Sequence, residues 1–202
     1  MTTFFSCDVE TTSTSALTGH LLTLGIQPVV LDENLVATKT GNSLYLRIDQ
    51  TENLDLAAID GMWGDPDNEA SSYGWWTKQN DQAQAEAWSD QSLVRHDIVT
   101  AAAMVSEFVS SVDENPKNRI FVANPVSFDK PWFDYMFWIS DITDPFHYQS
   151  LCLRSMKFGL REKTSWTPLR DNHEPRIPHH ALWDADAQAD DLVAMLFERD
   201  KS

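Results

Sequence analysis

Apolar residues gather in three short stretches near the start of the chain. Residues 4–10 are mainly apolar, residues 21–30 form a second apolar run, and residues 44–49 alternate apolar and polar side chains. Such patterns are typical of β-strands. Because the connections between the stretches are short, they are predicted to form an antiparallel meander.

Longer-period patterns dominate the rest of the chain. After a predicted loop at residues 49–72, an Ala/Gln-rich helix is expected to end near Trp88, and Asp97 is expected to cap a second helix. Further elements are predicted as a buried strand at 119–123, an aromatic helix at 131–139, a short helix at 150–160, and a final helix with apolar residues three and four apart. This order indicates one α/β domain over residues 1–202, with helices covering a mixed sheet.

Two carboxylates interrupt the first apolar stretch. Asp8 and Glu10 are two residues apart, so in a strand they point to the same face. Adjacent buried anions repel each other and are costly to desolvate. A divalent cation bound through oxygen would compensate both charges. Acid-x-acid pairs also occur elsewhere in this acidic chain, so the apolar strand around this pair is what makes it a candidate metal site.

Two later segments carry similar candidates. Asp129 follows a strand that ends at Asn124, where it can reach a metal on a neighbouring strand or simply cap the next helix. Asp184 falls in the first turns of the final helix, and small residues beside it would let that helix approach the sheet. His179 lies five residues earlier and is a candidate general base, although a lone histidine is more often structural.

These three segments resemble the motifs of the DEDDh (DnaQ-like) 3′→5′ exonucleases. The first motif matches Asp8-Val9-Glu10-Thr11-Thr12, the second matches Asn124 to Phe128-Asp129, and the third matches His179-His180-Ala181-Leu182-Trp183-Asp184-Ala185. The motifs occur in the family's order over nearly the whole chain. Two departures concern Ser13, where many relatives have glycine, and the spacing from Asn124 to Asp129, which is one residue longer than usual.

The resemblance implies a ribonuclease H-like fold and a metal-dependent 3′–5′ exonuclease. Asp8, Glu10, Asp129 and Asp184 would hold two Mg²⁺ or Mn²⁺ ions, and the motif assigns the general base to His179 rather than His180. The products would be nucleoside 5′-monophosphates, released from single-stranded nucleic acid or a 3′ overhang. The alternative is a catalytically weak, nuclease-like module that binds nucleic acid or protein. By the same resemblance a homodimer is expected, and the substrate contacts are assigned to Thr11, Asn124, Trp75, Trp76 and Gln79.

Trp75 and Trp76 also have a simpler interpretation, because adjacent tryptophans on a helix point in different directions. Either one can pack in the core while the other stacks on a terminal base.

Charge and composition indicate which binding partners and which cellular location to expect. The net charge of −16 opposes broad, non-specific binding to nucleic acid. Six of the 15 basic residues nevertheless lie between Arg154 and Arg176, and they either hold a short strand or form a solvated surface. Two cysteines in apolar surroundings and the lack of a long apolar run predict a soluble, cytoplasmic protein without membrane contact. The motifs do not distinguish RNA from DNA.

Overall fold

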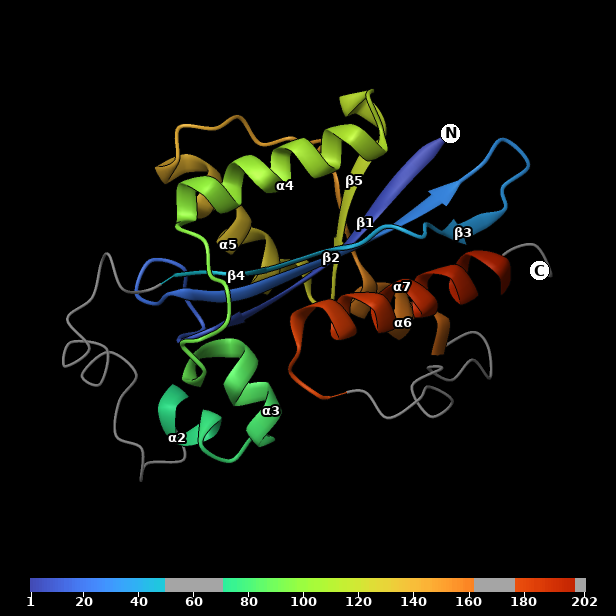
Figure 1. The fold of residues 1–202 in the computed structure, drawn as a ribbon. Helices are drawn as coiled ribbons and strands as arrows, with labels where there is room; N and C mark the ends of the chain where they lie inside the picture. Colours follow the sequence, from blue (N-terminus) through green and yellow to red (C-terminus); the bar gives the residue numbers. More distant parts are fainter. Residues whose placement is uncertain (50–70, 162–176, 199–202) are drawn as a thin grey trace.

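The computed structural model describes residues 1–49, 71–161 and 177–198 (Figure 1). Within these ranges the strands form one six-stranded sheet in the order β3-β2-β1-β5-β6, and β4 also pairs with β2. The strands are β1 (Thr2–Thr11), β2 (Leu21–Leu31), β3 (Ala37–Lys39), β4 (Leu44–Arg47), β5 (Arg119–Ala123) and β6 (Ser150–Cys152). Residues 50–70 of the predicted loop at 49–72, and several basic residues after 161, lie outside the described residues, and Ser72 begins the helix α2 (Ser72–Trp76).

The antiparallel meander is confirmed, since β1 pairs with β2 and β2 pairs with β4. The strands β1, β5 and β6 are parallel, so their carboxyl ends meet at one edge of the sheet. The short strand β3 was not predicted, because Ala37-Thr38-Lys39 has no apolar pattern and lies at an edge of the sheet. It pairs with the end of β2 that β4 leaves open.

The described helices are α2 (Ser72–Trp76), α3 (Asp81–Gln84), α4 (Ile98–Val112), α5 (Val126–Ile139), α6 (Leu153–Arg161) and α7 (Ala181–Glu198), with a π-helix (Ala85–Ser89) and a 3₁₀ turn (Pro116–Asn118). Asp97 caps α4 as predicted, and its side chain accepts a hydrogen bond from the N–H of Thr100 at 2.9 Å. The aromatic helix α5 begins five residues before Pro131, directly after Pro125. The helix predicted from residue 150 instead begins at Leu153, because residues 150–152 pair with β5 as strand β6.

Helices cover both faces of the sheet (Figure 1). Phe5, Cys7 and Val9 of β1 pack in one apolar cluster with residues of α4 and α5. Phe4 belongs to a second cluster on the opposite face, formed with residues of α6 and α7. The alternation of side chains along β1 therefore directs its even-numbered residues towards α7. None of the helices in the described ranges has the length and apolar character needed to cross a membrane.

Candidate active site

Asp8 and Glu10 both lie on the face of β1 that α7 covers. Glu10 is buried, with 7 % of its surface exposed, and Asp8 is partly exposed. Both are near the carboxyl end of the strand, where the backbone pairing with β2 becomes irregular after Glu10. The alternating strand pattern thus places two carboxylates side by side at the edge where the parallel strands end.

Asp129 joins this pair from the neighbouring strand's side. It lies in the first turn of α5, which follows β5, and only 2 % of its surface is exposed. Its Oδ1 accepts a hydrogen bond from the backbone N–H of Val9 at 3.2 Å. Because Val9 separates Asp8 from Glu10 in the sequence, this bond fixes Asp129 against the segment that carries both acids.

The first turn of α7 brings Asp184 to the same place. A Cβ atom added at Gly25 would lie 2.4 Å from the carbonyl carbon of Ala181, so only glycine permits this approach of helix to strand. Gly25 pairs with Asp8 in the β1–β2 ladder. The helix therefore begins directly over the acidic pair, and Asp184 is in that first turn.

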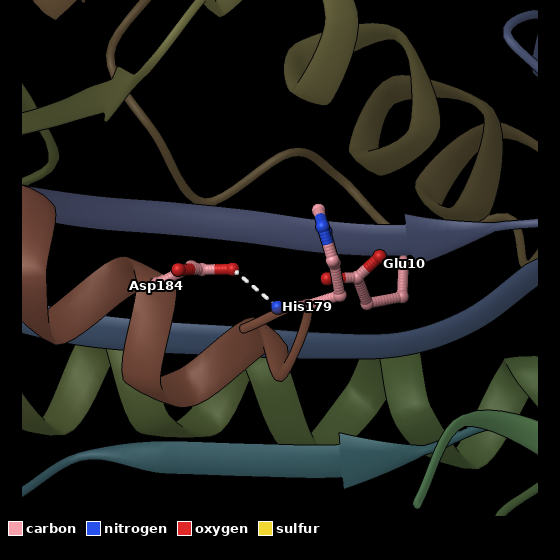
Figure 2. Close-up of side chains that lie close together, drawn as sticks. All are labelled: Glu10, His179 and Asp184. Carbon is pink, nitrogen blue, oxygen red and sulfur yellow. Dashed lines mark hydrogen bonds between the residues drawn. The ribbon is translucent and has the colours of Figure 1, made fainter. Parts of the chain in front are cut away.

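His179 precedes α7 and has a left-handed backbone, with φ of 62°. This conformation is uncommon for residues other than glycine. The backbone N–H of His179 donates to Oδ2 of Asp184 at 3.1 Å (Figure 2). One potential ligand atom from each of Glu10, His179 and Asp184 lies within 4.8 Å of the others, so these three side chains could hold a metal ion.

These groups line one cavity of about 690 Å³. Its lining residues include all five predicted catalytic residues, namely Asp8, Glu10, Asp129, His179 and Asp184. They come from three segments that are far apart in the sequence. The arrangement can hold hard cations and present the imidazole of His179 to a bound substrate.

The surrounding protein raises the pKa of three carboxyl groups. Burial, followed by the charges of Asp129 and Glu10, raises the pKa of Asp8 well above its usual range. Burial and the charge of Asp184 do the same to the pKa of Glu10. Burial raises the pKa of Asp129 to about 7, although the N–H of Val9 opposes this shift. Concentrated negative charge with little compensation and an oxygen-rich donor set fits Mg²⁺ or Mn²⁺.

Gln188 is a site residue that the sequence reasoning missed. It is 3 % exposed, lines the cavity, and donates from Nε2 to Oδ1 of Asp8 at 2.7 Å. The available signal was its spacing, because residues four apart on a helix share a face and Gln188 follows Asp184 by four. The amide is neutral, so it orients the Asp8 carboxylate without neutralising it.

His180 occupies a different environment from His179. It is 8 % exposed and its ring stacks on Tyr45, with ring centroids 4.3 Å apart, and on Trp183, at 5.0 Å. Burial lowers the pKa of His180 below its ordinary value. His180 is not among the residues that line the cavity, which His179 does line.

The two tryptophans predicted as substrate contacts lie in different environments. Trp76 is 1 % exposed, packs in a core cluster with Leu22, and donates from Nε1 to the carbonyl oxygen of Thr11 at 3.0 Å. Trp75 is 39 % exposed and its ring stands edge-on to that of His179, with centroids 4.7 Å apart. Both line the cavity.

Of the three remaining predicted substrate contacts, two line the cavity and one does not. Thr11 and Asn124 line the cavity, and the Thr11 hydroxyl donates to the carbonyl oxygen of Ser13 at 2.7 Å. Gln79 is not among the lining residues, and its Nε2 donates instead to the carbonyl oxygen of Trp75 at 2.8 Å. From the basic segment, Arg154 lines the cavity, whereas Lys163, Arg170 and Arg176 lie outside the described residues.

A sequence model of the 3′-5′ exoribonuclease Rv2179c-like domain matches residues 3–196. The chain belongs to this family. The description of this family as a 3′-5′ exoribonuclease domain agrees with the resemblance that the three motifs indicated. No curated protein matches the chain by sequence.

Solved structures confirm the ribonuclease H-like fold. E. coli exonuclease I in a zinc-bound complex with single-stranded DNA is 17 % identical, with a TM-score of 0.63 over 99 % of this chain and 41 % of that chain. The complex of the same enzyme with a dT13 oligonucleotide is 16 % identical, with a TM-score of 0.62 over 98 % of this chain and 42 % of that chain. The chain thus spans about two fifths of the length of these exonuclease I chains.

The raised carboxyl pKa values predict how stability depends on pH without metal. A raised pKa in the folded state means that folding favours the neutral acid. The contribution of Asp129 is therefore complete below its unfolded pKa of about 3.9 and is lost as the pH rises through about 7. In EDTA at pH 8, Asp129→Asn should raise the melting temperature by about 4–8 °C, the shift that ~2 kcal/mol produces in a domain of this size.

Thermal melts at pH 5 and pH 8 test this expectation. Glu33→Gln removes the same charge from an exposed position outside the cavity and should have little effect, which separates the local effect from that of the net charge. Equal shifts for both variants would contradict the interpretation. At pH 8, added Mn²⁺ should raise the melting temperature of the wild-type protein more than it raises that of the Asp129→Asn protein, since a ligand stabilises the state that binds it.

Proposed function

We propose that this cavity hydrolyses the terminal phosphodiester at the 3′ end of single-stranded nucleic acid and releases nucleoside 5′-monophosphates. The observation that carries the proposal is the convergence of four carboxylates and His179 in one cavity. Asp8, Glu10, Asp129 and Asp184 would hold two Mg²⁺ or Mn²⁺ ions. When bound, such ions activate water and stabilise the negative charge that develops on the phosphate oxygens and the leaving group.

His179 is the proposed general base. Its side chain lies in the cavity beside Glu10, and its position before α7 is fixed by the bond to Asp184. The imidazole accepts a proton as a water oxygen attacks phosphorus, and the bond from phosphorus to the 3′ oxygen breaks. The phosphate stays on the released nucleotide. The proximity of His179 to Glu10 and Asp184 also permits metal ligation, and the two roles predict different mutant behaviour.

Single-stranded RNA is the proposed substrate. The matching family is described as an exoribonuclease, and the exonuclease I structures of similar fold contain single-stranded DNA. Incubation of 5′-labelled RNA and DNA of matched sequence with Mg²⁺ should shorten the RNA from its 3′ end at the higher kcat/KM, and EDTA should stop the reaction. Binding without shortening would instead support a nuclease-like binding module. A homodimer and a cytoplasmic location stay predictions.

Trp75 is predicted to stack on the terminal base. Removing a stacking ring costs about 1–3 kcal/mol per base, so Trp75→Ala should raise KM about 5- to 150-fold while the melting temperature changes little. Trp138→Ala removes another exposed tryptophan from α5, outside the cavity lining, and should leave KM unchanged. Steady-state kinetics on one RNA oligonucleotide compares the variants. An unchanged KM in Trp75→Ala would remove this residue from the site.

A further inference from the structure

Arg154 is the one arginine or lysine among the described residues that line the cavity. It is exposed and lies in the first turn of α6, directly after β6. Trp75 belongs to α2 and contacts His179, near the end of β1. In the sheet order β6 is two strands from β1, so it lies about 10 Å away at the usual strand spacing. Arg154 therefore enters the cavity from the β6 side of the sheet and Trp75 from the side of β1.

The helix that carries Arg154 is fixed to α7 by a buried ion pair. Nζ of Lys157 lies 2.6 Å from Oδ2 of Asp191, and the two side chains are 11 % and 2 % exposed. Lys157 is one turn after Arg154 on α6, and Asp191 is one turn after Gln188 on α7. Breaking a buried pair on one side leaves an uncompensated charge, so the pair resists separation of the helices. The backbone of Arg154 is thus held in a constant position relative to the carboxylates.

Among the described residues, the guanidinium group of Arg154 makes one side-chain hydrogen bond. Its described hydrogen bond runs from Nη2 to the carbonyl oxygen of Asn124 at 3.4 Å, which is long for a bond of this type. A guanidinium group carries five N–H donors and matches the oxygens of a phosphate with two parallel bonds. Arg154 lines the cavity, so these donors can reach a phosphate that is bound there.

Charge explains why a phosphate needs this residue. The four carboxylates make the cavity strongly negative, and the whole chain carries a net charge of −16. Metal ions held by Asp8, Glu10, Asp129 and Asp184 would compensate the scissile phosphate. A phosphate one nucleotide further along the strand needs a positive partner of its own, and Arg154 is the one arginine or lysine among the described residues that line the cavity.

We propose that Arg154 binds the phosphate immediately upstream of the scissile one and thereby sets which linkage lies over the carboxylates. This inference rests on the proposed function, because it assumes that the 3′-terminal nucleotide lies towards Trp75. Loss of one charge-assisted contact should weaken binding about 10- to 100-fold.

Neutral phosphate analogues test the contact directly. RNA oligonucleotides carry one methylphosphonate, either at the linkage upstream of the scissile one or three linkages further away. The upstream substitution should raise the wild-type KM about tenfold or more, and Arg154→Gln should raise KM for unmodified RNA by a similar factor. When the two changes are combined, KM should rise no more than with either change alone. The distant methylphosphonate should change KM by the same factor in the wild-type protein and in Arg154→Gln.

Lys117→Gln is the matched control. Lys117 is exposed in the turn before β5, at the opposite end of that strand from Asn124. For the Lys117→Gln protein, the upstream methylphosphonate should raise KM by the same factor as for the wild-type protein. If the upstream methylphosphonate raises the KM of Arg154→Gln by the same factor as it raises the KM of the wild-type protein, the proposal is overturned. The same four combinations of protein and RNA can also be compared by binding affinity, with Asp184→Asn present in every protein. This comparison decides the role of Arg154 even if the wild-type protein does not cleave RNA. Absence of cleavage would count against the proposed function alone.

Discussion

Replacing Asp184 with asparagine should lower the turnover number about 10³-fold, equivalent to ~4 kcal/mol of activation barrier. Asp8→Asn, Glu10→Gln and Asp129→Asn should have similar effects, because each removes one charge from a donor set that acts as a unit. The fold should survive, since these carboxylates repel one another and burial raises the pKa of Asp8, Glu10 and Asp129. Melting temperatures in EDTA should be equal to or above that of the wild-type protein.

Asp186→Asn provides the control on the same helix. Asp186 pairs with Lys39 at 2.6 Å and is not among the residues that line the cavity, so its loss should change turnover less than twofold. Rates of RNA shortening at saturating Mg²⁺ give the comparison. If a cavity variant keeps more than about a tenth of wild-type turnover, a barrier change below ~1.4 kcal/mol, that residue does not belong to the catalytic set.

His179→Ala should lower activity about 10²–10⁴-fold, the usual contribution of a positioned proton acceptor. If the imidazole acts as the base, Mn²⁺ affinity should stay nearly unchanged when measured by calorimetry. The pH–rate profile should also lose the limb that a histidine produces near its unperturbed pKa of about 6.5. A large loss of Mn²⁺ affinity would instead make His179 a metal ligand, as its distance to Glu10 and Asp184 allows.

His180→Phe is the comparison for that variant. His180 is stacked between Tyr45 and Trp183, and phenylalanine preserves a ring in that position. Activity should therefore remain within a few-fold of the wild-type value. His180→Ala would confuse the comparison, because loss of a buried ring also lowers stability. An inactive His180→Phe together with an active His179→Ala would reverse the proposed roles.

The sequence predicted the site best where one local period decides the direction of a side chain. Asp8 and Glu10 share a face because strands alternate, and Phe5, Cys7 and Val9 pack on the other face as that rule requires. The motif order also predicted that Asp129 and Asp184 would join them, and both line the cavity.

Features that depend on contacts between distant segments could not be predicted in this way. The approach of α7 to β2 depends on Gly25, a residue with no local signal for that role. The strand at residues 150–152 is defined by its pairing with β5 rather than by its own pattern, and the sequence pattern alone predicts the start of a helix there. Arg154 reaches the cavity because β6 places it there, whereas sequence alone gave it no more weight than its five basic neighbours.

The identity of the product tests the central claim most directly. Wild-type protein is incubated with Mg²⁺ and an RNA oligonucleotide labelled at its 5′ end, and the small product is identified by mass spectrometry. We expect nucleoside 5′-monophosphates, a labelled RNA that shortens one nucleotide at a time from its 3′ end, and neither result with EDTA or with Asp184→Asn. Nucleoside 3′-monophosphates, internal fragments, or an unchanged rate in Asp184→Asn would contradict a carboxylate-bound, metal-dependent 3′–5′ exonuclease site.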